Sequence, residues 1–460
     1  MLFALARSRL LSRLLPPLLP RHFTVCLLAA TLAACGGGGG GGGGEGGGGS
    51  STSRAGVTAT GTASAALTTP PTTVGNVLPV VVDAGPGGTR FQVVNVPYVS
   101  VTVCTPGTGA AAACQTIDHV LVDTGSVGLR LLQSSLSSSL SLPQVTNASG
   151  QAIGECAQFA DGFLWGSVRK ADVYLAGELA ASVSIQDVGD QPGGAVGVPS
   201  DCSSAGGLNL AASGQLGARG ILGVGLFTND CDVCLARAIG AVYYACTGTG
   251  CANTAVTNAQ VVKNPVALFA LSGDSNGVVM ELPAVAGSAS SLSGTLTFGI
   301  GTQANNALGA AVVYPTDGSG DFTTRYTPVG SGTVVTMSSF VDSGSNGLFF
   351  NDAGIPVCSL STGFYCPPLP PPVSPLNSPL ALSAQIVAAA PSAASATVNF
   401  TLLNTDALSG STVAANIGGP MGFGLGNVFD WGLPFFYGRR VFTAISGAAT
   451  PGGNGPFIAF

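Results

Sequence analysis

Charged side chains are scarce in this sequence. Only 8% of its 460 residues are charged, about a third of the usual share, and the formal net charge is -6. With 15 Lys and Arg against 21 Asp and Glu, the sequence predicts no basic patch, which argues against nucleic acid and anionic lipid headgroups as partners. The surface must therefore be built from Ser, Thr, Asn, Gln and Gly.

Histidine is also nearly absent. The chain has two, and only His119 remains if the first 35 residues are removed as a signal. A His-dependent nucleophilic triad or a multi-His metal site is therefore hard to build, and we expect neither a metal nor a cofactor. We expect His119 to lie on the strand that leads into Asp123, and Trp165 and Trp431 to be packing residues.

The apolar run near the N-terminus is too short to cross a bilayer. This run, "FTVCLLAATLA", follows four arginines and is typical of an export signal. It ends in "LAAC", Leu32 to Cys35, which resembles a bacterial lipobox and implies cleavage before Cys35 and lipidation of that cysteine. A plain secretory signal, cut at an Ala-x-Ala-like site, is the alternative.

A flexible tether is predicted over residues 36–75. Residues 36–49 are Gly except for Glu45, and residues 50–75 are rich in Ser, Thr, Ala and Gly. With a lipid on Cys35, this segment would hold a folded body away from a membrane. By analogy, Gly36 rather than Asp after the cysteine favours the outer membrane, with the body on its periplasmic face or at the cell surface.

Ten cysteines follow residue 35, and an even number in an exported chain predicts disulfides. The sequence does not fix their connectivity. Three pairs bracket short loops and are natural local disulfides: Cys104 with Cys114, Cys246 with Cys251, and Cys358 with Cys366. The four cysteines between 231 and 251 could instead form a zinc knuckle, which the lack of a nearby His makes the weaker alternative. The Cys-x-x-Cys at 231–234 lacks the βαβ setting of a redox motif.

Helical periodicity is scarce as well. Short runs of β-branched and apolar residues recur instead, separated by Gly, Pro, Asn and Asp, and they predict a mostly β chain. The segment Asn264–Leu271 is the candidate for a short helix, with Pro265 at its first position. Residues 367–379 are too rich in proline for a central strand and predict a surface loop.

One eight-residue motif occurs twice in the sequence with small changes. "VDTGSVGL", Val122–Leu129, returns as "VDSGSNGL", Val341–Leu348. A second motif supports the repeat, since "GILGVG", Gly220–Gly225, is matched by "GLGNVF", Gly424–Phe429, in the second half of the chain. We therefore predict a duplicated fold with an approximate two-fold axis, an N-terminal lobe over 76–304 and a C-terminal lobe over 305–460.

Such an axis would bring Asp123 and Asp342 together at the junction of the lobes. Two facing carboxylates can share one proton, because like charges that close cannot both ionise cheaply. One can then act as a base toward water while the other, protonated, polarises a carbonyl. Turn aspartates at strand ends are the alternative reading of each motif taken alone.

With these paired motifs, the sequence resembles the pepsin-like aspartic proteases. The two triplets match that family's paired active-site motifs, each followed by a hydroxyl residue, and the likeness covers most of residues 90–460. It also extends to an uncharacterised bacterial branch of exported proteins with the same paired triplets. The resemblance implies an all-β, bilobal fold with Asp123 and Asp342 as the catalytic dyad. It assigns support of the dyad to Thr124, Gly125, Ser126, Ser343, Gly344 and Ser345.

The same resemblance places a flap at "FADGFLWG", residues 159–166. Phe159 stands where the family has a Tyr, Asp161 where it has a small hydroxyl residue, and Gly162 follows in the turn. Arg130 stands where the family often has a Trp that bonds the flap Tyr. Arg130 and Asp161 would either bind substrate or form an ordinary surface ion pair.

The first hypothesis is therefore a cell-envelope aspartic endopeptidase, monomeric and anchored through Cys35, which binds an extended peptide or protein substrate beneath the flap. The altered flap supports a second hypothesis, a catalytically inactive module that binds peptide or glycan. A β-rich adhesin-like surface protein without a cleft is the third.

Overall fold

The computed structural model describes residues 67–460 except 74, 88–92, 108, 110–111, 196, 205–206, 213, 270–272, 369–378 and 423–425. The predicted signal, Cys35 and most of the predicted tether lie outside this part, as does most of the proline-rich segment. Among the described residues, no helix has the length and apolarity needed to cross a membrane. The end of the predicted tether belongs to the folded body, because Thr68 and Gly75 form backbone hydrogen bonds with Cys114 and Ala176.

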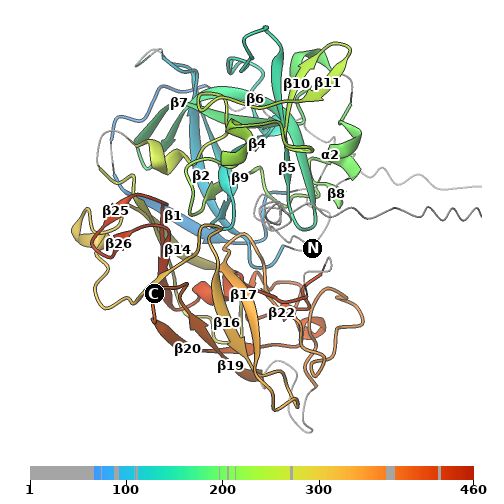
Figure 1. Ribbon diagram of the computed structural model, residues 1–460, viewed down its shortest axis with the longest axis vertical. Coiled ribbons are helices and arrows are strands. Elements are labelled where there is room, and N and C mark those ends of the chain that lie inside the picture. Colours follow the sequence, from blue (N-terminus) through green and yellow to red (C-terminus); the bar gives the residue numbers. More distant parts are fainter. Residues whose placement is uncertain are drawn as a thin grey trace, which may run out of the picture.

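The larger of the main sheets has sixteen strands and contains most of the N-terminal lobe (Figure 1). β8 (Leu208–Asn209) pairs with β6, and the others follow the order β11 (Gly250–Asn253), β10 (Tyr243–Thr247), β5 (Ala152–Gln158), β6 (Gly162–Leu175), β7 (Glu178–Val188), β4 (Val127–Leu132), β9 (Gly220–Val224), β3 (Cys114–Asp123), β2 (Pro97–Cys104), β1 (Val77–Val82), β14 (Leu292–Phe298), β12 (Gly277–Leu282), β24 (Arg439–Ala444), β27 (Phe457–Ala459) and β15 (Val313–Pro315).

The C-terminal lobe contains a seven-stranded sheet and smaller elements. Its order is β20 (Ser395–Leu402), β19 (Leu380–Val387), β16 (Phe322–Tyr326), β17 (Val335–Val341), β23 (Val428–Trp431), β18 (Leu348–Phe349) and β22 (Gly418–Gly419). Two short pairs are β13 (Ser288–Ala289) with β21 (Ala414–Ala415), and β25 (Ala449–Thr450) with β26 (Gly453–Asn454). The helices are short: α2 (Ser200–Ser204), η2 (Gln133–Ser135), η3 (Pro192–Gly194), η4 (Asp232–Leu235), η5 (Pro265–Leu268), η6 (Ala304–Asn306), η7 (Thr405–Ala407) and η8 (Leu433–Phe436).

The two halves of the chain share the larger sheet. β12 pairs with β14 on one side and with β24, from the C-terminal end of the chain, on the other. β27 and β15 continue the sheet beyond β24, and Figure 1 shows β1 and β14 at the junction of the two halves. Because these strands are hydrogen-bonded across the halves, the lobes are joined by a sheet rather than by a linker. The predicted all-β, bilobal architecture is confirmed.

The duplication is visible in the strand pairing. β3 runs parallel to β9, and β9 then pairs antiparallel with β4. In the second half, β17 runs parallel to β23, and β23 pairs antiparallel with β18. In order and in pairing, β3, β4 and β9 of the first lobe therefore correspond to β17, β18 and β23 of the second lobe.

The register corrects one part of the predicted repeat. Val122 pairs with Leu222, and the equivalent Val341 pairs with Trp431. The counterpart of Gly223 is therefore Gly432. The predicted match at Gly424–Phe429 is wrong, because that segment precedes the true counterpart in the sequence. Residue 424 lies outside the described residues. A Cβ at Gly432 would lie 2.1 Å from the Gly347 carbonyl oxygen, so only glycine fits there.

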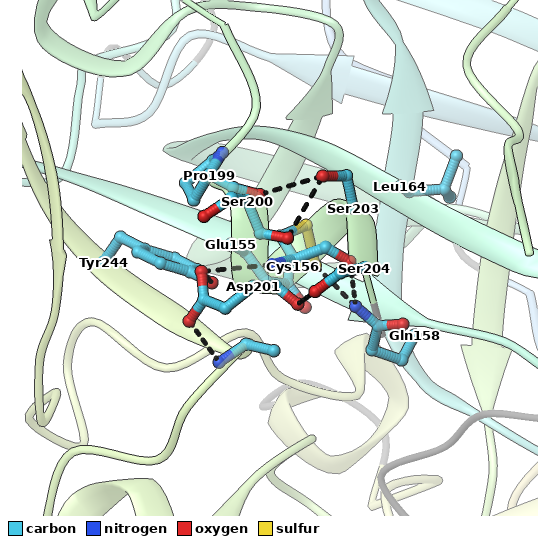
Figure 2. The surroundings of a disulfide bond; sticks show 12 residues. Glu155, Cys156, Gln158, Leu164, Pro199, Ser200, Asp201, Ser203, Ser204 and Tyr244 are labelled. Carbon is cyan, nitrogen blue, oxygen red and sulfur yellow. Dashed lines mark hydrogen bonds between the residues drawn. A yellow bond between two sulfur atoms is a disulfide. The ribbon is translucent and has the colours of Figure 1, made fainter. Parts of the chain in front are cut away.

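Five disulfides link the ten cysteines. The three local pairs predicted from the sequence are confirmed, and the zinc knuckle is wrong, because residues 231 and 234 bond to each other and residues 246 and 251 do the same. The fifth disulfide, Cys156–Cys202, ties α2 to strand β5, and Figure 2 shows Asp201 of α2 bonded to Tyr244 beside it. The loop that carries α2 is thereby fixed against the β5–β6 hairpin.

Three smaller predictions also have an outcome. The predicted helix at Asn264–Leu271 is a single 3-10 turn, η5, in which the Asn264 side chain accepts a hydrogen bond from the Val266 amide. His119 lies on β3, as expected. Trp165 and Trp431 are both buried and pack within the lobes.

Candidate active site

Asp123 is the last residue of β3, Asp342 directly follows the equivalent strand β17, and both side chains are fully buried. In each Asp-Thr/Ser-Gly triplet, the backbone amide of the glycine donates a hydrogen bond to the carboxylate of the aspartate. The Gly125 amide donates to Asp123 Oδ1 at 2.7 Å, and the Gly344 amide donates to Asp342 Oδ1 at 2.8 Å. The hydroxyls one residue further on bond the other oxygens: Ser126 Oγ to Asp123 Oδ2, and Ser345 Oγ to Asp342 Oδ2 at 3.0 Å. Each carboxylate is therefore held in one orientation by its own turn.

Thr124 and Ser343 join the two turns by reciprocal hydrogen bonds. The Thr124 amide donates to Ser343 Oγ at 3.0 Å, and the Ser343 amide donates to Thr124 Oγ1 at 2.9 Å. The two hydroxyls then donate across the junction, Thr124 to the Val341 carbonyl and Ser343 to the Val122 carbonyl. These four hydrogen bonds fix the two turns face to face.

The Asp342 carboxylate lies directly against Gly125. A Cβ atom at Gly125 would stand 2.5 Å from Asp342 Cγ and 2.6 Å from both carboxylate oxygens. No side chain fits in that space. The glycine of the first triplet is thus required by the carboxylate of the second.

Gly125→Ala is therefore expected to damage the site. Forcing a methyl group into this contact costs about 1–3 kcal/mol of folding free energy, and a displacement of about 1 Å at a catalytic group lowers activity by about 100-fold. The control is Gly240→Ala, where no atom lies within 4 Å of the added Cβ. Denaturant unfolding and a cleavage assay on both variants test this, and equal effects at the two positions would contradict it.

Burial raises the pKa of Asp342 well above its usual range, and the neighbouring Asp123 raises it further by Coulombic repulsion. Asp430 repels the same group, and a hydrogen bond with Asp123 also favours the protonated form. Asp342 therefore retains a proton under conditions in which an exposed carboxyl has lost it.

Asp430 was missed by sequence reasoning. It lies on β23, fully buried, one residue before Trp431, and it occupies the place that Ile221 has in the first lobe. The sequence motif expected for this strand has apolar residues before its glycine. Because Asp430 is charged, the segment before Gly432 does not fit that motif and was not recognised. The signal that could have found it is the sequence "DWG", aligned on Gly432 rather than on the earlier glycines.

The predicted flap is a hairpin turn between β5 and β6. The Phe159 amide donates to the Gly162 carbonyl at 2.7 Å, and the Asp161 carbonyl accepts from Leu208 of β8. Phe159 packs in a cluster of the N-terminal lobe, whereas Ala160 belongs to a buried cluster with residues of the C-terminal lobe, including Phe349. The turn thus spans from one lobe to the other.

Arg130 is not a surface residue, and it does not pair with Asp161. It is 4% exposed, and its Nη2 donates to Glu155 at 2.5 Å and to Asp230 at 3.0 Å. Its Nη1 donates to the Val127 carbonyl at 2.7 Å. The predicted surface ion pair is wrong, because Glu155 and Asp230 satisfy the guanidinium inside the lobe.

Asp230 and Glu155 form a second carboxyl pair, which the sequence did not reveal. Burial raises the pKa of Asp230 well above its usual range, and repulsion by Glu155 and a hydrogen bond with it act in the same direction. Arg130 and the Tyr243 hydroxyl, which donates to Asp230 at 2.8 Å, only partly oppose this. The guanidinium of Arg130 thus lies between two buried carboxyls, and burial makes Asp230 harder to ionise than an exposed carboxyl.

These shifts predict that the protein is more stable in mild acid than in mild base. The folded pKa values of Asp342 and Asp230 are raised, and burial raises the pKa of Asp187 to about 7. Unfolded carboxyls lose their protons near about pH 4, so above that pH the folded state binds more protons and its free energy of unfolding falls as pH rises. Below about pH 4 the sign reverses for groups such as Asp190, whose pKa is lowered.

Thermal unfolding between pH 3 and 9 measures this dependence. We expect the highest Tm at about pH 4–6 and a steady fall above it. Asp187→Asn should flatten the part of the fall that lies around neutral pH. A Tm that rises from pH 5 to pH 8 would contradict the raised pKa values.

Comparisons with known proteins show the family to which the chain belongs and a likeness to solved structures. Residues 72–460 match the family described as "Protein of unknown function (DUF3443)". The crystal structure of an aspartic proteinase from Irpex lacteus is similar over 83% of this chain and 96% of that chain, with 16% identity and a TM-score of 0.48. Comparison with curated proteins gives no match.

Proposed function

The chain belongs to the DUF3443 family, and from its own site we propose that it is an aspartic endopeptidase of the cell envelope. One observation carries the proposal: two fully buried carboxyls, Asp123 and Asp342, whose turns are held face to face by reciprocal hydrogen bonds. A structural role alone does not require such a pair. Burying two like charges is costly unless they share a proton, and the shared proton is what hydrolysis needs.

In the proposed reaction Asp342 carries the proton and Asp123 is the base. Asp342 donates a hydrogen bond to the carbonyl oxygen of the scissile peptide, while Asp123 takes a proton from a water molecule. As the water oxygen attacks the carbonyl carbon, the Asp342 proton moves to the carbonyl oxygen, which gives a neutral tetrahedral gem-diol. The proton held by Asp123 then passes to the amide nitrogen and the C–N bond breaks. One hydroxyl of the gem-diol returns its proton to Asp342 as the carboxylic acid product forms, so both carboxyls regain their starting states.

The remaining parts of the site support this reaction. The turn glycine amides and the Ser126 and Ser345 hydroxyls fix the carboxylate oxygens, so little reorganisation is needed as charge develops. The flap turn covers the junction of the lobes and would exclude bulk water from a bound, extended peptide. Because the turn is packed in both lobes, it must lift before a substrate enters.

The packed flap also favours the second candidate function, a non-catalytic module that binds peptide or glycan. Phe159, 2% exposed, carries no hydroxyl for a catalytic hydrogen-bond network. Ligand binding that is indifferent to Asp123→Asn, together with no turnover at any pH, would favour this candidate over the peptidase.

The proposed setting is the outer membrane. Cys35 would carry the lipid anchor, and the Gly-rich segment after it would hold a monomeric body within reach of unfolded envelope proteins. Labelling with a fatty acid analogue tests the anchor: wild type should be labelled and Cys35→Ser should not. Label that survives in Cys35→Ser would contradict it.

Peptidase activity is tested with residues 36–460 and a reduced, unfolded protein as substrate. We expect cleavage at about pH 3–6, where one of two neighbouring carboxyls is protonated. Mass spectrometry of the products identifies each cut bond. Intact substrate over the whole range from pH 3 to 8 would contradict the proposal.

A further inference from the structure

An open cavity in the C-terminal lobe lies outside the site described above. Its volume is about 530 Å³, within the range of about 300–1,000 Å³ that small-molecule sites occupy. Residues 381–383 of β19 and 399–401 of β20 line it, and these two paired strands lie near the bottom of the view in Figure 1. Further lining residues come from the segment after β12, from η8 and from the start of β24. None of them belongs to the flap turn or to the two triplets.

Apolar side chains form much of this lining. Leu382 and Phe400 are directly opposite each other in the β19–β20 register, so their side chains lie on the same face of the sheet. Both are partly buried and pack against the main core of the molecule. Leu348 of β18 and Pro434 of η8, which are buried, add to the apolar wall. Such a wall favours the apolar part of a ligand.

Arg439 is the one charged residue among those that line the cavity. Its guanidinium lies 4.9 Å from the centre of the Phe435 ring, and its Nη1 donates to the Phe435 carbonyl at 2.7 Å. Within the described part of the chain, no carboxylate lies within 4.0 Å of this guanidinium. Nε and Nη2 have no hydrogen-bond partner among the described residues, and neither atom is sealed from solvent.

A partly buried cation without a counterion is costly, and burial accordingly lowers the pKa of Arg439. The contacts with Phe435 hold the guanidinium in place. Two of its nitrogens therefore remain as a fixed pair of donors, which matches the two oxygens of a carboxylate. An anionic group beside an apolar wall satisfies both features of the cavity.

We propose that this cavity binds a small molecule that has one carboxylate and an apolar chain, the chemistry of a fatty acid. The carboxylate accepts hydrogen bonds from Arg439, and the chain lies against Leu382 and Phe400. The cavity contains no residue of the dyad, so the proposal is independent of the peptidase proposal.

Octanoate and octanol test the proposal, because their chains have the same length and only octanoate is charged. Each is titrated into residues 36–460 by isothermal titration calorimetry at neutral pH. We expect octanoate to bind about tenfold or more tightly than octanol, since hydrogen bonds to a charged group contribute this much. Equal affinities, or no binding of octanoate at millimolar concentration, would overturn the proposal.

Arg439→Met removes the charge at similar length. It should weaken octanoate binding by about tenfold or more and leave octanol binding unchanged. The matched control is Arg440→Met, the next residue of β24, which lies outside the cavity and pairs with Glu281. That variant should bind octanoate like wild type. Equal losses in the two variants, or a folded Arg439→Met that keeps the full affinity, would overturn the role of Arg439.

An octanoate analogue with a diazirine at the end of its chain locates the site in the wild type, which decides the matter if Arg439→Met does not fold. Mass spectrometry should find the cross-link at residues that line the cavity, such as 381–383 or 399–401. A cross-link found only at residues outside this lining would overturn the proposal.

Asp342→Asn separates this proposal from the peptidase proposal. The variant should bind octanoate like wild type, because the dyad lies outside the cavity. Peptide cleavage by wild type without octanoate binding would overturn the cavity site alone. Octanoate binding without peptide cleavage would overturn the peptidase alone.

Discussion

Asp342→Asn is expected to abolish peptide cleavage, with a loss of about 10⁴-fold or more in kcat/KM. An amide cannot hold and release the proton that Asp342 shares with Asp123. The variant should nevertheless fold, because the Asn carbonyl can still accept from the Gly344 amide and the Asn amide nitrogen can donate to Ser345 Oγ. Removal of a buried carboxyl with a raised pKa should also keep its Tm at pH 8 at or above that of wild type.

Asp123→Asn should have the same effect on cleavage, and the double variant should lose no more than either single one, because the pair acts as a unit. The matched control is Asp317→Asn, a carboxylate in an exposed turn, which should retain full activity. Cleavage by Asp342→Asn at more than about 1% of the wild-type rate would contradict the assignment of the dyad.

Arg130→Met is expected to produce the largest loss of stability, about 3–5 kcal/mol at pH 7.5. Met has a similar length, but it leaves Glu155 and Asp230 buried without their cation. Breaking a buried charge cluster by removing one partner is costly in this way, whereas an exposed pair contributes little. Denaturant unfolding followed by circular dichroism measures the loss.

The loss should shrink in the double variant with Glu155→Gln, because only one ionisable carboxyl then remains beside the missing cation. The control is Arg325→Met on β16, where the side chain is exposed and a change within about 0.5 kcal/mol is expected. A loss below about 1 kcal/mol for Arg130→Met would show that the cluster does not stabilise the lobe.

The sequence predicted the dyad because the information is local and repeated. Each triplet contains its carboxylate, its turn glycine and its hydroxyl within four residues, and two copies 219 residues apart imply a facing pair. The all-β fold followed from the same local patterns, alternating runs and frequent turn residues. These features depend on near neighbours, which a single sequence displays.

The environment of Arg130 could not be predicted in the same way. Its partners lie 25 and 100 residues away and come from β5 and the segment before η4. Nothing local distinguishes an arginine with buried partners from an exposed one, so the surface ion pair with Asp161, one of the two alternatives for Arg130, was wrong.

Strand β23 of the second lobe could not be located from the sequence, for a different reason. The apolar-Gly pattern was sought and found at Gly424, yet the strand that pairs with β17 ends at Trp431. Asp430 replaces an apolar residue there, so the true match departs from the pattern at its most informative position. Only the register between strands identifies Gly432 as the equivalent of Gly223.

The pH dependence of kcat/KM for one cleaved peptide tests the shared proton most directly. The account predicts a bell-shaped profile with its maximum at about pH 3–6, because both carboxyls are protonated below the maximum and both are ionised above it. The alkaline limb should follow the raised pKa of Asp342. A profile that stays flat, or that rises from pH 5 to pH 9, would contradict a mechanism in which Asp123 and Asp342 hold one proton between them.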